Sequence, residues 1–147
     1  MKQNEKDEKK DYGSKHSSER AVNPEAAREV RSRVKSGELY CAAAFAAAKK
    51  LGLPPEEIGF TADRLELPIT HCQLGLHGWG SEGKRVQRAE EVSEELEAAI
   101  RSRLDNGKLS CLAAWEIARD LGIGKMAVAS ACEALEIKIK DCQLGTF

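Results

Sequence analysis

Four of the five cysteines form two pairs with equal spacing, and paired thiols can do chemistry. Cys41 and Cys72 have the same separation in the sequence as Cys111 and Cys142. Three interpretations are open for these residues. Each thiol could be a small buried hydrophobic side chain, each pair could form one reversible disulfide, or all four could hold a soft metal ion or an iron–sulfur cluster. The first two interpretations require no cofactor.

Two histidines stand close to one of these cysteines, but the arrangement is not repeated. His71 and His77 lie near Cys72 in the sequence, whereas the equivalent positions around Cys142 carry no histidine. We therefore predict that the histidines are incidental to any metal site. The fifth cysteine, Cys132, corresponds to an alanine in the other half of the chain, so we predict that it belongs to the core.

An identical run, Cys-Gln-Leu-Gly, contains the second cysteine of each pair. As structure, the glycine turns the chain, the leucine anchors it and the glutamine caps backbone groups. As function, two exposed turns would present twin sites to a ligand or partner. The residues concerned are Gln73, Leu74, Gly75, Gln143, Leu144 and Gly145.

Signatures of catalysis are missing from the chain, so we predict that it is not an enzyme. It contains no Gly-rich phosphate loop, no GxSxG motif and no HExxH motif. The neighbouring residues His71 and Cys72 are unsuited to acting together, because adjacent side chains on a strand point to opposite faces.

These repeated features arise from an internal duplication of the chain. Residues 25–77 align with residues 95–147 without a gap. The predicted organisation is a disordered polar tail (1–22), a first module (23–77), a linker with the start of the next helix (78–94) and a second module (95–147). The charged residues from Lys84 onward have helical spacing, which predicts an early start for that helix.

Each module is predicted to contain three helices and a short β-pairing. In the first module we expect a helix from Pro24 to Gly37, a strand at Leu39–Cys41, helices at Ala42–Lys50 and Pro54–Glu66, and a strand at Leu67–Ile69. In the second module, Gly107 is the predicted end of the first helix and Ile137–Lys140 is the second strand. The expected fold class is mainly α, with two tandem modules.

The second and third predicted helices resemble the helix-turn-helix of DNA-binding domains. The second module reads Ile117-Ala118-x-x-Leu121-Gly122-Ile123, followed by Val128, and the first module matches with Ala47-Ala48, Leu51-Gly52-Leu53 and Ile58. The order of elements is that of the winged variety. This resemblance implies that the third helix enters the major groove of DNA.

The charges favour phosphate contacts from the first helices instead, because the predicted third helices are acidic. The candidate DNA-contacting residues are Arg28, Arg31, Arg33, Lys35, Arg101, Arg103 and Lys125. The leading hypothesis is a DNA-binding transcriptional regulator that responds to thiol oxidation or metal. The alternative is a protein-interaction or accessory adaptor that uses the same fold without DNA.

The composition of the chain bears on both its partner and its compartment. The formal net charge is −1, so no global positive field attracts nucleic acid. The sequence has neither a secretory signal nor an apolar run long enough to span a membrane. Five cysteines in such a chain indicate reduced thiols, and we expect a cytoplasmic protein, with homodimerisation open.

Overall fold

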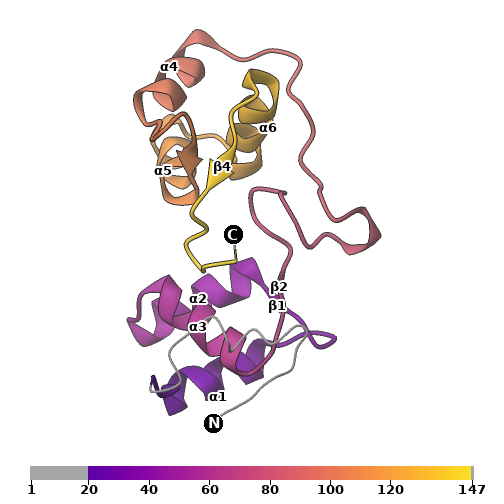
Figure 1. Cartoon of the computed structure of the whole chain (residues 1–147), viewed down its shortest axis with the longest axis vertical. Helices are drawn as coiled ribbons and strands as arrows, with labels where there is room; N and C mark the ends of the chain where they lie inside the picture. The colour runs from indigo at the N-terminus through magenta and orange to yellow at the C-terminus, as the bar shows by residue number, and fades with distance from the viewer. Residues whose placement is uncertain (1–19, 147) are drawn as a thin grey trace. The chain divides into compact units, whose positions relative to one another are not determined.

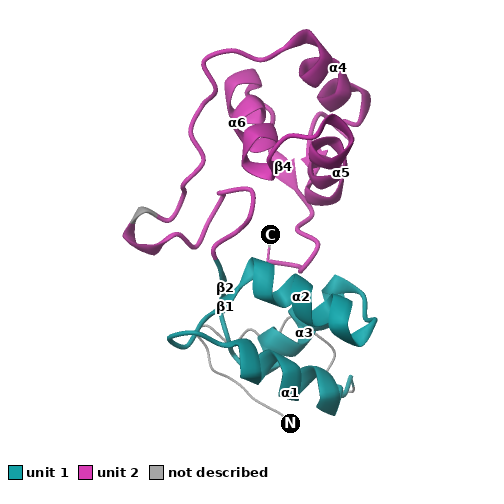
Figure 2. Ribbon diagram, turned by 180° about the vertical axis from the view of Figure 1, so that it is seen from behind, with its two compact units in different colours: residues 1–70 teal, residues 71–147 magenta. Residues whose placement is uncertain are grey.

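The computed structural model describes residues 20–146 and divides into two compact units, residues 1–70 and 71–147 (Figure 2). Unit 1 contains α1 (Pro24–Arg33), β1 (Leu39–Tyr40), α2 (Cys41–Leu51), α3 (Pro55–Arg64) and β2 (Ile69–Thr70). Unit 2 contains the 3-10 helix η3 (Gly80–Glu82), α4 (Glu94–Ser102), β3 (Leu109–Ser110), α5 (Cys111–Leu121), α6 (Lys125–Leu135) and β4 (Ile139–Lys140) (Figure 1). The described part is mainly α, in two similar units, as predicted. Residues 1–19 of the predicted tail lie outside the described residues.

The first helix of each module ends before the glycine that was predicted to end it. α1 ends at Arg33, and the chain then makes a tight turn closed by two backbone hydrogen bonds between Lys35 and Glu38 (2.8 and 2.9 Å). Gly37 lies within this turn with a φ of 78°, and Gly107 repeats it in unit 2 with a φ of 76°. Both glycines therefore serve the turn, which requires left-handed backbone.

The second and third helices meet at the predicted glycine. Gly52 and Gly122 have φ values of 67° and 69°, and each ends the second helix of its module in the left-handed conformation. Ala48 and Ala118 are buried beside these turns. Small side chains at these positions let the helices of each module pack closely, as the sequence predicts.

A short parallel sheet connects the two ends of each module. β1 pairs with β2 so that Leu39 lies opposite Ile69, and β3 pairs with β4 so that Leu109 lies opposite Ile139. The pairing between these two segments was predicted. Since α2 and α5 begin at the residue after β1 and β3, Cys111 in unit 2 lies at the end of its sheet.

The segment that joins the two modules is extended, and the predicted helix start at Lys84 is wrong. α4 begins only at Glu94, where the Ser93 hydroxyl caps its first turn. Val86 is buried in the core of unit 2, and its backbone N–H donates to the carbonyl of Gly75 at 3.0 Å. This tertiary anchor outweighs the local helical preference of an otherwise charged segment.

The core of unit 2 includes residues from the end of the first repeat. Cys72 and Leu74 belong to the same buried cluster as Leu109, Ile117 and Val128. Residues 71–77, which the repeat assigns to the first module, are therefore part of unit 2. Among residues 20–146, no helix has the length and apolar character needed to cross a membrane.

Candidate functional site

The basic residues of α1 differ in whether they are already engaged. Arg33 donates to Glu29 at 2.7 Å, and Lys50 lies 3.1 Å from the same carboxylate. The hydrogen bond from Arg33, joined by one from Lys50, holds the pKa of Glu29 below its ordinary value. Arg28 and Arg31 are exposed, and neither has an ion-pair partner within residues 20–146.

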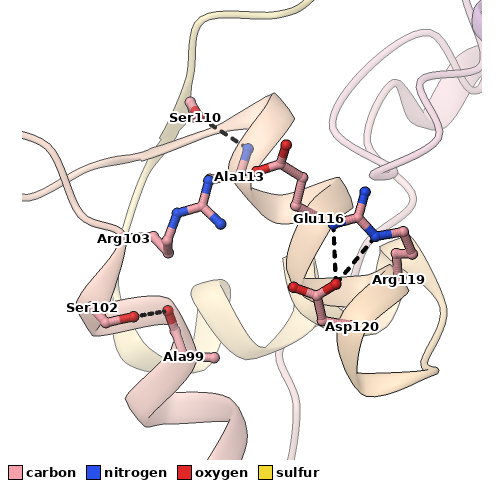
Figure 3. Close-up of polar contacts among 8 residues, drawn as sticks. All are labelled: Ala99, Ser102, Arg103, Ser110, Ala113, Glu116, Arg119 and Asp120. Carbon is pink, nitrogen blue, oxygen red and sulfur yellow. Dashed lines mark hydrogen bonds and ion pairs between the residues drawn. The ribbon is translucent and has the colours of Figure 1, made fainter.

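Three of the predicted DNA-contacting residues lie in unit 2, and each contacts another side chain there. Arg101 donates to Glu97 at 2.8 Å, and Arg103 donates to Glu116 at 2.6 Å (Figure 3). Lys125 lies over the ring of Trp115, with its nitrogen 4.6 Å from the ring centre. In unit 1, Lys35 similarly lies 5.8 Å from the ring of Tyr40. These engaged cations do not form a free basic surface.

The third helix of unit 1 has no open face along its middle. Every residue from Ile58 to Asp63 is buried. Because an α-helix completes a turn in about 3.6 residues, this run covers all sides of α3. Part of the cover comes from Arg20, which pairs with Glu57 and places its guanidinium 3.8 Å from the centre of the Phe60 ring.

The third helix of unit 2 is crossed by the extended segment 84–89, which we call the strap. Figure 1 shows this segment passing alongside α6. The strap is held by backbone and charge together. Ala89 N–H donates to the carbonyl of Ser130 at 3.1 Å, Arg88 donates to the carbonyl of Ala134 at 3.2 Å, and Lys84 lies 2.9 Å from Glu133.

The outward side of α5 is the surface that the sequence reasoning missed. Leu112 is 49% exposed and Ile123 is 37% exposed, the most exposed large hydrophobic side chains described. Glu116 and Arg119 follow Leu112 at helical spacing, so these three share one side of α5, and Ile123 lies just beyond the Gly122 that ends the helix. We call these four residues the α5 stripe, and Figure 3 shows its charged middle. The sequence contained a signal for this exposed apolar surface, since Leu112 stands where the first repeat has an alanine.

The five cysteines are all free thiols, and most of them are buried. Cys142 is half-buried, whereas the others lie in the interior: Cys41, Cys72, Cys111 and Cys132. Burial raises the pKa of the Cys132 thiol to about 11, and Cys132 is a core residue as predicted. Burial also raises the pKa of Cys111, and the nearby thiols of Cys142 and Cys72 contribute to the same shift. Three thiols therefore lie near one another in unit 2.

Both Cys-Gln-Leu-Gly runs form turns, but their leucines do not reach the surface. Leu74 and Leu144 are buried, and the neighbouring glutamines, Gln73 and Gln143, are partly buried. Each turn is closed by a 2.9 Å hydrogen bond from the glycine N–H to the cysteine carbonyl. Gln143 also donates its side-chain amide to the sulfur of Cys111 at 3.4 Å. Both runs thus anchor the chain through a buried leucine, and the second run also contacts the sulfur of Cys111.

The sulfur of Cys142 is surrounded by donors. The backbone N–H of Leu144 donates to it at 3.4 Å, and the hydroxyl of Thr146 donates at 3.0 Å. The same hydroxyl lies 3.3 Å from Nε2 of His77, whose pKa is lowered by burial. His77, predicted to be incidental, and Thr146 come from the two different repeats. No sequence signal links them, because they occupy non-equivalent positions in the alignment.

Metal binding and homology give no further assignment for these residues. Within the part of the chain that the structure describes, no group of three or more His, Cys, Asp or Glu side chains is arranged to hold a metal ion. The chain matches no protein-family model, no curated protein and no solved structure.

Proposed function

We propose that this chain is a protein-interaction adaptor built from two helix-turn-helix modules. The observation that carries the proposal is the cover on both third helices. A helix that reads bases must present an open face to the major groove. The middle of α3, Ile58 to Asp63, is buried on all sides, and α6 is crossed by the strap.

The charges support the same proposal. Glu56 and Glu57 occupy the first turn of α3. Two of the three basic residues of the strap, Lys84 and Arg88, pair with acids near the end of α6. Phosphate binding depends on free Lys and Arg side chains. Most of the predicted DNA-contacting residues are instead engaged by Glu side chains or aromatic rings.

The α5 stripe is the proposed partner-binding surface. Leu112 and Ile123 supply exposed apolar area at its two ends. Arg119, paired with Asp120 at 3.0 Å, and Glu116 supply polar contacts between them (Figure 3). Apolar anchors beside polar groups are the composition that protein interfaces use. The five free thiols support a reducing compartment, the cytoplasm, as the location.

Photo-crosslinking tests this proposal at the stripe. We expect a photoreactive phenylalanine analogue at position 112 to give protein adducts in cells, and the same analogue at the exposed position 95 on α4 to give none. Leu112→Asp should remove the partner that co-purifies with the intact chain. Equal adducts at both positions would contradict the assignment of the surface.

DNA binding through α1 is a second candidate function, because Arg28 and Arg31 are exposed and have no ion-pair partner among the described residues. It would make the chain a transcriptional regulator that grips phosphates without reading bases through its third helices. Titration of a random DNA duplex at low salt separates the two functions. The adaptor proposal expects no binding. Binding that weakens steeply with salt, and that Arg31→Ala reduces across all sequences, would favour DNA instead.

A further inference from the structure

The end of the second repeat contains the cysteine that solvent reaches most easily. Cys142 is half-buried, whereas the other four cysteines are buried. Its sulfur accepts hydrogen bonds from the Leu144 N–H and from the Thr146 hydroxyl. These two donors hold the sulfur of the half-buried cysteine in place beside polar groups.

A hydrogen-bonded chain continues from this sulfur to an imidazole. The Thr146 hydroxyl has one hydrogen, which it donates to Cys142, so its oxygen is left to accept a hydrogen bond from Nε2 of His77 at 3.3 Å. This arrangement requires the His77 tautomer that carries its proton on Nε2. Cys142, Thr146 and His77 together form what we call the thiol relay.

A second thiol lies beside the relay. Ser110 and Lys140 are paired across the sheet, Cys111 follows Ser110 directly, and Cys142 comes two residues after Lys140. Gln143, the neighbour of Cys142, contacts the sulfur of Cys111 at 3.4 Å. The contact with Gln143 places the Cys111 sulfur next to the segment that carries Cys142, as a disulfide between the two cysteines would require.

We propose that Cys142 is a site of reversible oxidation by hydroperoxides and that Cys111 is its resolving thiol. The Cys142 sulfur attacks the peroxide, forming an S–O bond as the O–O bond breaks, and its proton leaves with the released alcohol or water. The Cys111 sulfur then attacks Cys142. An S–S bond forms, the S–O bond breaks, and the hydroxyl departs as water with the proton of Cys111. Two thiols thereby transfer two electrons to the peroxide.

The turn of the first repeat lacks the hydroxyl of the relay. Leu76 occupies the position that corresponds to Thr146, and it has no hydroxyl to donate. The proposal thus assigns oxidation to one pair rather than to two equivalent pairs. It does not rest on the proposed adaptor function, because it concerns the thiols alone.

Peptide mapping of the full, reduced chain after brief treatment with hydrogen peroxide tests the proposal. We expect a disulfide-linked peptide joining Cys111 and Cys142, formed at least roughly tenfold faster than any oxidation of Cys132. Cys111→Ser should leave Cys142 as a sulfenic acid that dimedone traps. Thr146→Val, which keeps the shape and removes the hydroxyl, should slow the reaction by roughly tenfold.

The matched control is Cys132→Ser, which should leave the rate and the product unchanged. The proposal is overturned if Cys142 reacts no faster than Cys132 or if Thr146→Val reacts at the rate of the unmodified chain. It is also overturned if the bridge joins Cys142 to Cys72 or to a second molecule.

Discussion

The two copies of Cys-Gln-Leu-Gly have the same backbone and different surroundings. Gly75 and Gly145 have φ values of 78° and 83°. A Cβ atom at Gly75 would lie 2.9 Å from the backbone nitrogen of Val86 and 3.1 Å from the sulfur of Met126, whereas a Cβ at Gly145 would meet no atom of the described residues within 4 Å. A repeated sequence therefore repeats a turn, while packing against other segments is set independently for each copy.

The first helices of the two modules differ in charge as well. α1 has one acidic residue in its first turn and two basic residues in its last turn. α4 has three acidic residues in its first turn and one basic residue in its last turn. Arg28 and Arg31, which have no ion-pair partner within residues 20–146, differ in this from Arg101 of unit 2, which is paired with Glu97. Duplication kept the fold and let the surfaces diverge.

The largest expected effect separates the two glycines. Gly75→Ala should destabilise the chain by about 3 kcal/mol, because a left-handed alanine is strained and its Cβ also overlaps the backbone of Val86. Gly145→Ala should cost only about 1 kcal/mol, because strain acts alone there. Chemical unfolding of both variants measures the difference. An equal loss of unfolding free energy in both variants would contradict the difference in packing around the two turns.

A smaller effect should be shared by the two modules. Ala48→Leu and Ala118→Leu should each cost about 2 kcal/mol, because both alanines are buried where helices pack closely. Ala46→Leu is the matched control, since Ala46 is exposed on α2 and should tolerate the larger side chain. Thermal unfolding followed by circular dichroism provides the comparison. A large loss in one module only would indicate that the two helix crossings are not equivalent.

The smallest effect is a pH dependence that belongs to unit 2. Lys140 donates to Asp105 at 2.7 Å, and this hydrogen bond lowers the pKa of Asp105 below its ordinary value. The resulting stabilisation is present above the unfolded-state pKa and is lost as pH falls through the folded-state pKa. Asp105 is highly exposed, so the contribution is small.

Asp105→Asn isolates that contribution. The variant should lose stability near neutral pH and should show a flatter dependence of unfolding free energy on pH in the acidic range. Among the described residues of unit 1 there is no equivalent ion pair, because Thr70 stands where Lys140 does and donates to Glu38 at 3.2 Å. Thr70→Val should therefore leave the acid dependence unchanged. An unaltered acid profile in Asp105→Asn would show that the ion pair does not contribute.

Local features of the fold could be predicted from the sequence alone. Asn23 and Pro24 start α1, because a capping side chain and a proline suit the first turn of a helix. Gly52 and Gly122 end the second helices, because glycine adopts left-handed backbone without a Cβ penalty. The duplication follows from comparison of the two halves of the sequence. The mainly α class, the buried alanines and the core position of Cys132 follow from the sequence patterns of the modules.

Only the tertiary structure decided where the connecting segments go. Lys84 begins a plausible helix by charge spacing, yet burial of Val86 and the backbone bonds to Gly75 hold this stretch extended over α6. The thiol relay likewise joins His77 to Thr146 across the two repeats, so alignment of the copies could not reveal it. Helix caps and turns depend on neighbours in sequence, whereas the strap and the relay depend on residues brought together by burying apolar side chains in a shared core.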